Sequence, residues 1–157
     1  HSLRRRQRQM CIRDSNSVAT SNCIDMFQEM RMTCFLQRST HQNPSVISAN
    51  EVLKMATIYG AKLLGIEKEL GSIEQGKKAD LIMLHIKKPH FYPKTNFTSH
   101  LVFSARASDV DTVIIDGKVV MEKRRVLTMD EEKILQQFQR IYEELSSLTS
   151  EDKFRAL

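Results

Sequence analysis

The chain has 157 residues, enough for one ordinary domain, and 41% hydrophobic with 27% charged residues is typical of a soluble globular protein. The formal net charge is +5, but five arginines lie in the first thirteen residues, which contain no acidic residue. Without those five, 19 basic residues (24 minus 5) balance 19 acidic ones, so the rest of the chain lacks the basic surface that nucleic-acid binding requires. We therefore expect no nucleic-acid partner. No apolar run is long enough to span a bilayer, so we expect no membrane partner either.

Residues 1–13, HSLRRRQRQMCIR, have little hydrophobic periodicity and lack the apolar core of a secretory signal. We expect this basic arm to be foreign to the fold, joined to a truncated gene. The three cysteines, Cys11, Cys23 and Cys34, show no paired metal-ligand spacing, and an odd number without a signal peptide indicates reduced thiols in a cytoplasmic protein.

A helix is predicted first in the segment 21–39. Cys23, Phe27, Met30 and Cys34 fall on one stripe of it, which predicts a core-facing side. Ser21 or Asn22 can cap its start, and Asp25 would then lie in the first turn.

A second helix is predicted after Ser48, because Ser48 and Glu51 have capping-box spacing and Gly65 is placed to end the helix. Ile47 and Val52 can form a hydrophobic staple around the cap. The expected apolar face comprises Val52, Met55, Ala56, Tyr59 and Leu63.

The segment GSIEQGKK, residues 71–78, has the glycine and lysine spacing of a phosphate-binding loop. That loop needs a strand before it, a helix after it, and Ser or Thr directly after the lysine, whereas position 78 is Lys and the apolar run 81–84 that follows is typical of a strand. The order helix, turn, strand provides no helix N-terminus for a phosphate. We therefore interpret Gly71 and Gly76 as turn residues.

The rest of the chain indicates a strand near 81–86, an irregular connection over 87–100, and an apolar LVFSA segment too short to classify. Asp116-Gly117 between two β-branched runs predicts a two-residue hairpin turn. Thr128 and Glu131 repeat the capping-box spacing before a last helix. Its stripe comprises Ile134, Leu135, Phe138, Ile141, Tyr142 and Leu145.

The five histidines show no His-x-His pair and no helical pair with an adjacent Glu, which a zinc site would use. We expect them to be surface or hydrogen-bonded structural residues. No Gly-x-Ser-x-Gly turn surrounds the serine-rich segment 14–22, so a serine nucleophile is not indicated.

Four blocks in order, SVATSNCIDMFQEMRMTCFLQR, VLKMATIYGAKLLGI, GSIEQGKKADLIML and VDTVIIDGKVV, resemble the C-terminal third of a metal-dependent amidohydrolase of the cytosine-deaminase and chlorohydrolase branch. Within that branch the sequence is most similar to the 5-methylthioadenosine/S-adenosylhomocysteine deaminases. The resemblance covers about residues 14–157 and implies an α/β fold: the C-terminal part of a (β/α)8 barrel plus part of the adjoining small β-sandwich domain.

The resemblance also implies a division of the chain. Residues 14–70 would hold a remnant of the last barrel strand and helices, 71–127 the return strands and hairpin of the β domain, and 128–157 a C-terminal helix. The parent enzyme would use zinc or iron to hydrolyse a C–N bond of an adenosine-type nucleoside or related heterocycle, in the cytoplasm and as a homo-oligomer. A full barrel takes about 250 residues, so we expect this chain alone to bind no metal and to be inactive.

The family's last-strand motif, Gly-Thr-Asp followed by Ser or Gly, is the part of the metal site within reach of this sequence. Aligned without a gap, the metal-contacting Asp of the family falls on Asn16, with Ser15 and Asp14 in the two preceding positions. A neutral amide is a poor replacement for a carboxylate that holds metal and moves a proton. Either the motif is scrambled at the junction with the arm, or Asp14 takes over in a shifted register, or the parent is divergent.

Two alternatives stay open at the level of sequence. The parent could be a chlorohydrolase or guanine-deaminase relative, since the substrate-contacting residues would lie elsewhere. The chain could instead be a non-catalytic α+β binding module with a basic arm.

Overall fold

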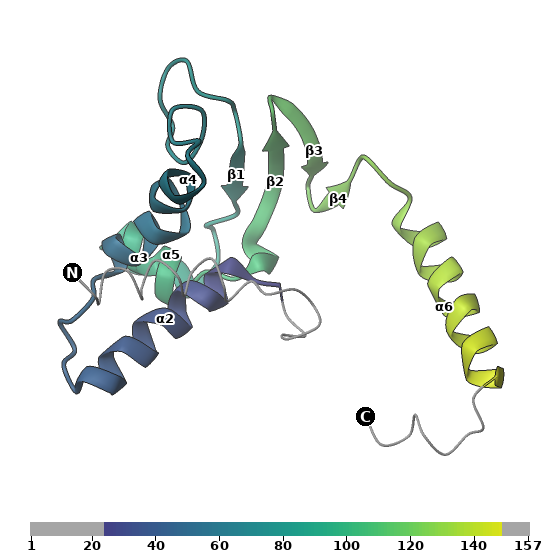
Figure 1. Ribbon diagram of the computed structural model, residues 1–157, viewed down its shortest axis with the longest axis horizontal. Coiled ribbons are helices and arrows are strands. Elements are labelled where there is room, and N and C mark those ends of the chain that lie inside the picture. The colour runs from purple at the N-terminus through teal and green to yellow at the C-terminus, as the bar shows by residue number, and fades with distance from the viewer. Residues whose placement is uncertain (1–23, 149–157) are drawn as a thin grey trace.

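The structure is a computed structural model that describes residues 24–148. A group of helices packs beside a four-stranded antiparallel sheet, and a long last helix follows (Figure 1). The expected mixture of helices and strands is confirmed. The predictions on Asp14, Asn16 and Cys23 lie outside the described residues.

Helix α2 spans Met26–His41 and begins later than the sequence suggests. Its N-cap is Asp25, whose Oδ1 accepts hydrogen bonds from Phe27 N at 2.8 Å and Gln28 N at 3.4 Å. The expectation of a cap at Ser21 or Asn22 is therefore wrong, because the Asp25 carboxylate itself satisfies the free N–H groups of the first turn. The predicted stripe is confirmed where it is described, since Phe27, Met30 and Cys34 are all buried.

The second predicted helix is divided into α3, Ala49–Ala56, and α4, Ile58–Leu64. Its start is as expected, with Ser48 Oγ accepting from Glu51 N at 3.1 Å and with Ile47 and Val52 buried. The break lies at Thr57, with φ −124° and ψ −101° and with Oγ1 donating to Leu53 O at 2.8 Å. Such local hydrogen bonds of threonine compete with the helical pattern.

The break at Thr57 rotates the face that the second half presents to the core. Ala61 is buried there, whereas Leu63 is 53% exposed, so the expectation that Leu63 packs inward is wrong. The helical end at Gly65 is confirmed, since this residue has φ 75° and its N–H donates to Lys62 O.

The sheet has the order β1-β2-β3-β4, with β1 at Leu81–Leu84, β2 at Val110–Ile115, β3 at Lys118–Glu122 and β4 at Arg125–Val126. All three pairings are antiparallel. The predicted hairpin joins β2 to β3, with φ 49° at Asp116 and 75° at Gly117, the left-handed pair that a two-residue turn requires.

The connection between β1 and β2 is more regular than the sequence indicates. It contains the short helix η1, Pro89–Phe91, then α5, Phe97–Phe103, and then the short helix η2, Ala107–Asp109. Asn96 caps α5 by accepting from Ser99 N at 3.0 Å, and the first three residues of the unclassified LVFSA segment form the end of that helix. Helix α5 packs on α2 and α3 and completes the core, which comprises Phe27, Met30, Cys34, Ile47, Val52, Met55, Phe91, Val102 and Ala105.

Helix α6 spans Glu131–Leu148 and stands apart from the rest of the described chain (Figure 1). Asp130, not Thr128, caps it, because Asp130 Oδ1 accepts from Lys133 N at 3.1 Å and Asp130 O accepts from Ile134 N. Every residue from Glu131 to Leu145 is exposed, including the predicted apolar stripe. Within residues 24–148, no helix combines the length and the apolar character needed to cross a membrane.

Candidate functional site

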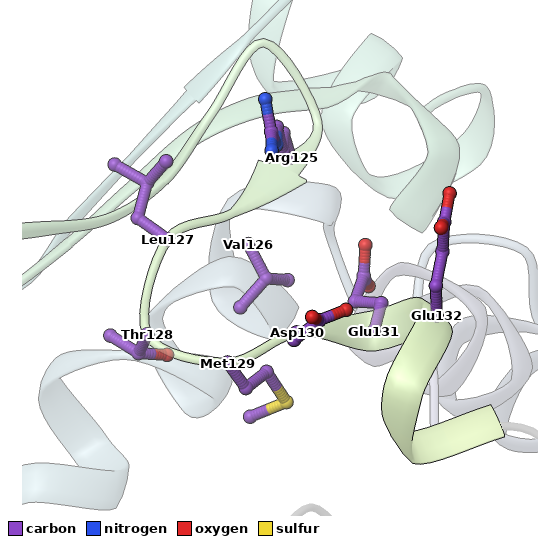
Figure 2. Close-up of a pocket in the computed structure, with 8 residues that line it drawn as sticks. All are labelled: Arg125, Val126, Leu127, Thr128, Met129, Asp130, Glu131 and Glu132. Atoms are coloured by element: carbon purple, nitrogen blue, oxygen red, sulfur yellow. The ribbon is translucent and has the colours of Figure 1, made fainter. Parts of the chain in front are cut away.

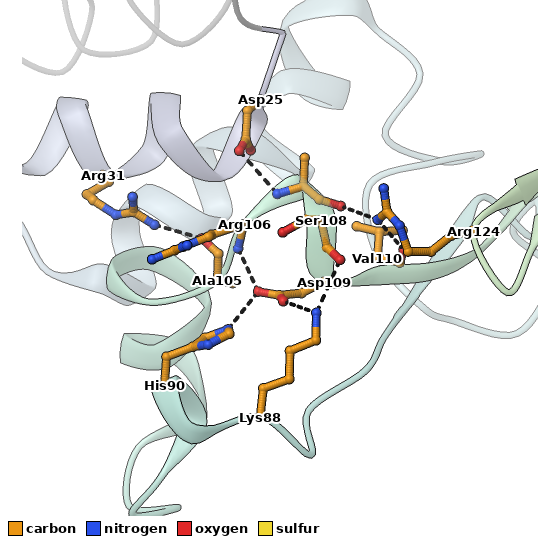
Figure 3. Close-up of polar contacts among 11 residues, drawn as sticks. Asp25, Arg31, Lys88, His90, Ala105, Arg106, Ser108, Asp109, Val110 and Arg124 are labelled. Carbon is orange, nitrogen blue, oxygen red and sulfur yellow. Dashed lines mark hydrogen bonds and ion pairs between the residues drawn. The ribbon is translucent and has the colours of Figure 1, made fainter.

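A group of polar side chains surrounds Asp109, at the end of η2 (Figure 3). The Asp109 side chain is 1% exposed. Its Oδ1 lies 2.6 Å from Lys88 Nζ, and its Oδ2 lies 2.8 Å from His90 Nε2 and accepts from Arg106 N at 3.0 Å. Lys88 and His90 flank the start of η1, so one carboxylate joins the two short helices between β1 and β2.

Further hydrogen bonds hold the segment 105–110 to side chains from other parts of the chain (Figure 3). Asp25 Oδ2 accepts from Ala107 N at 3.1 Å, so the residue that caps α2 also binds η2. Arg31 Nη2 donates to Ala105 O at 2.7 Å, and Arg124 Nη1 donates to Ala107 O and Val110 O at 3.2 and 3.1 Å. The helical layer and the sheet therefore meet at this segment.

The neighbouring hydrogen-bond donors keep the Asp109 carboxyl ionised. Burial raises the pKa of the Asp109 carboxyl, but hydrogen bonds from Lys88, His90 and Arg106 N together lower it below its usual value. The Lys88 ammonium supplies a compensating charge, which a buried carboxylate needs if it is to remain charged.

Acid should weaken the fold through this carboxylate. A folded-state pKa below the unfolded value means that the stabilisation is complete above the unfolded pKa, about 3.9, and is lost as pH falls through the lower folded value. We expect stability to decline below about pH 4 and the decline to be shallower in Asp109→Asn, which has no proton to take up at this position. Urea unfolding measured between pH 2.5 and pH 6 checks this, and identical pH profiles for the two proteins would contradict it.

The cluster does not fit a metal ion. A cation would have to displace the Lys88 ammonium, a like charge, from Asp109 Oδ1. In the described part of the chain, no three His, Cys, Asp or Glu side chains gather closely enough to hold a metal. Zinc sites take three or four such ligands, so residues 24–148 supply no such site by themselves.

Two surface pockets are further candidate sites, and each lacks a group of converging polar side chains like the one around Asp109. One of about 890 Å³ is lined by residues 125–132, a single continuous stretch between β4 and α6, so it lacks groups converging from several elements (Figure 2). The other, of about 590 Å³, is a mainly apolar groove between α3, α4 and β1, with Lys78 and Asp80 among its lining residues.

The interpretation of residues 71–78 as a turn is confirmed. Gly71 and Gly76 have φ 92° and 91°, and the segment leads from α4 into β1. Lys77 is engaged within the protein, since its Nζ donates to Glu67 O at 2.7 Å and to Ser72 Oγ at 2.5 Å. Its side chain is 12% exposed, which leaves no free ammonium for a phosphate.

Sequence reasoning placed His90 in an irregular connection and expected hydrogen-bonded structural histidines. The structure shows such a bond for His90, and also for His100, whose Nε2 lies 2.9 Å from Pro93 O. The Asp109 cluster as a whole was missed, because Lys88 and His90 lie 21 and 19 residues before Asp109 and no local motif links them.

Helices beside a four-stranded antiparallel sheet make residues 24–148 a mixed α/β structure. The sequence matches the Amidohydrolase family over residues 7–120, so the chain belongs to that family. The match begins inside the segment 1–13, and the foreign origin of that arm stays a prediction.

Several curated relatives are named as deaminases. The chain is 50% identical over 121 residues to the 5-methylthioadenosine/S-adenosylhomocysteine deaminase of Dictyoglomus turgidum, covering 77% of this chain and 28% of the relative. It is 44% identical over 131 residues to the 5'-deoxyadenosine deaminase of Methanosarcina acetivorans, covering 83% and 30%. The chain thus spans less than a third of the length of these relatives.

Solved structures agree on the fold. A zinc-bound adenosine deaminase from Xanthomonas campestris superimposes with a TM-score of 0.79 at 28% identity, covering 83% of this chain and 30% of that one. The zinc-complexed atrazine chlorohydrolase of Arthrobacter aurescens gives 0.66 at 24% identity, covering 73% and 26%. The expected amidohydrolase fold is therefore confirmed for the part that this chain represents.

Proposed function

We propose that this chain serves as one portion of a metal-dependent deaminase that acts on adenosine nucleosides modified at the 5' position. The observation that carries the proposal is the 50% identity over 121 residues to a 5-methylthioadenosine/S-adenosylhomocysteine deaminase. The 44% identity to a 5'-deoxyadenosine deaminase supports the same substrate class, since both names describe adenosine with an altered 5' substituent.

In the proposed reaction, water replaces the amino group on the purine ring and ammonia is released. The zinc of the Xanthomonas campestris structure supports a metal that activates this water. Because residues 24–148 do not gather three metal-ligating side chains, we assign the metal, zinc or iron, to ligands outside them. The described residues would act as a scaffold, with the Asp109 cluster fixing the helical layer against the sheet.

The proposal has a further consequence for the chain by itself. Catalytic groups of a barrel enzyme come from the ends of several strands, and the chain spans 28% of the Dictyoglomus turgidum relative. We propose that the 157-residue chain alone does not turn over substrate. A small-molecule nucleoside would be the partner of the completed enzyme, and we place that enzyme in the cytoplasm.

Complementation tests the proposal directly. The Dictyoglomus turgidum deaminase, shortened by the segment that aligns with this chain, would be co-expressed with the full 157-residue chain, supplied with zinc, and assayed for ammonia release from 5'-deoxyadenosine. We expect activity from the mixture and none from either part alone. A matched control replaces wild type with Val102→Asp, which buries an unpaired carboxylate at a fully buried position and should abolish complementation.

The outcomes separate the alternatives. Two soluble parts that associate but release no ammonia would contradict the proposal. Ammonia release by this chain alone above a zinc blank would contradict the proposed inactivity of the chain. Turnover of guanine or a chlorinated triazine instead of the adenosine nucleoside would favour the other hydrolase branches.

A further inference from the structure

Two turns of the sheet have the same backbone geometry but very different residues. In the β2–β3 turn, Asp116 and Gly117 have φ 49° and 75°, and in the β3–β4 turn, Lys123 and Arg124 have φ 47° and 63°. Both are two-residue loops, because the residues on either side are paired across the hairpin. Asp-Gly adopts two left-handed residues readily, whereas the side chains of Lys and Arg disfavour this backbone. The β3–β4 turn therefore depends on a contact from elsewhere in the fold.

Arg124 itself makes such a contact. Its Nη1 donates to Ala107 O at 3.2 Å and to Val110 O at 3.1 Å, and its backbone N–H donates to Asp111 O at 2.9 Å. The guanidinium thus binds where η2 joins β2, beside the Asp109 cluster (Figure 3). Because the buried Asp109 carboxylate holds η2 in place, Arg124 binds to a fixed part of the fold.

The hairpin has few other contacts to keep it closed. Strand β4 is two residues long and lies at the edge of the sheet, and Leu127, which follows it, is 54% exposed. Short edge segments with little buried apolar surface have low local stability. None of the buried core residues lies in β4 or α6, so this end of the chain can open while the core stays folded.

We propose that the β3–β4 hairpin has two positions, and that Arg124 is the residue that closes it. In the closed position the guanidinium is bound to η2; in the open position that contact is broken and β4 is released together with α6. Binding of one side chain then replaces the turn preference that Lys123 and Arg124 lack. The same residue of η2, Ala107, also donates to Asp25 at the start of α2, so the closed hairpin joins both ends of the described chain. The proposal does not rest on the deaminase function.

Amide hydrogen exchange of the full 157-residue chain, followed by nuclear magnetic resonance, tests the proposal. The Leu127 N–H, which donates to Val120 O at 2.9 Å, reports opening of the hairpin. The N–H of the buried Val52, bonded to Ser48 O, reports unfolding of the core. In Arg124→Gln the Leu127 amide should exchange about fivefold faster, as expected for the loss of two exposed hydrogen bonds, and the Val52 amide should be unchanged.

Two further variants separate binding of the guanidinium from turn preference. Lys123→Gln also replaces a cation by Gln at a left-handed, exposed position of the same turn, so exchange at Leu127 should stay within about twofold of wild type. Lys123→Asn/Arg124→Gly removes the guanidinium but provides the residue pair that this turn prefers. It should therefore restore slow exchange at Leu127.

Each other result would overturn the proposal. An unchanged Leu127 amide in Arg124→Gln, or equal acceleration in Lys123→Gln, would show that the guanidinium does not hold the hairpin closed. A parallel rise at Val52 would show unfolding of the whole chain and no separate open position. Exchange in Lys123→Asn/Arg124→Gly as fast as in Arg124→Gln would show that Arg124 does not compensate for an unfavourable turn.

Discussion

Replacing Asp109 by Asn should lower the free energy of unfolding by about 3 kcal/mol, as expected when one member of a buried ion pair is removed. The substitution leaves Lys88 without its counter-charge and turns an amide N–H₂ or a weaker acceptor toward Arg106 N. Lys88 and His90 are about one-third exposed and recover part of their hydration, which keeps the loss below the upper end of that range.

The matched control is Asp116→Asn. Asp116 is an exposed carboxyl at a hairpin position with φ 49°, which Asn also adopts readily, so its loss should change stability by less than about 0.5 kcal/mol. A suitable probe is Cys34, which is 0% exposed, labelled by a thiol reagent across a urea series in a Cys11→Ser/Cys23→Ser background. Equal urea midpoints for the two Asn variants would show that the Asp109 cluster contributes nothing specific.

The second large effect is expected from Gly71→Ala. Gly71 has φ 92°, and a Cβ built there would lie 2.8 Å from Ala61 Cβ and 2.9 Å from Ile58 Cα. Left-handed backbone costs an L-residue about 1–2 kcal/mol, and overpacking adds about 1–3 kcal/mol. We expect a total loss of about 3 kcal/mol, because the backbone of α4 must move away from the loop.

Gly76→Ala isolates the steric part of that loss. Gly76 has nearly the same φ, 91°, but a Cβ there meets no atom within 4 Å. Its replacement should therefore cost only the backbone term, about 1–2 kcal/mol. The same Cys34 labelling gives both values, and a Gly76→Ala variant as unstable as Gly71→Ala would refute the close approach of residue 71 to α4.

Features set by a few neighbouring residues were predictable from sequence. The Asp116-Gly117 hairpin follows from the backbone angles that this dipeptide adopts, and the cap at Ser48 follows from its spacing to Glu51. The order of helix, turn and strand around Gly71 also followed, because the flanking hydrophobic patterns differ in period.

Features that depend on competing hydrogen bonds, or on contacts between residues far apart in the sequence, were not predictable. Thr57 divides a continuous helical pattern through its own hydrogen bond to Leu53 O, and Asp130 replaces Thr128 as a cap because it also satisfies the spacing to Lys133 N. Asp25 binds Ala107, 82 residues away, and Asp109 collects Lys88 and His90 from another short helix. Such contacts arise only from the packed fold. The assignment of Asn16 or Asp14 to the family's metal-binding position lies outside the described residues and stays a prediction.

The central claim is that this chain supplies a folded portion of a deaminase whose catalysis needs the remainder of the amidohydrolase fold. Ammonia release from 5'-deoxyadenosine by the full chain together with the shortened Dictyoglomus turgidum relative tests it most directly. The account predicts zinc-dependent release from the mixture and none from the chain alone. Release by the chain alone, or a silent mixture of two associated parts, would contradict it.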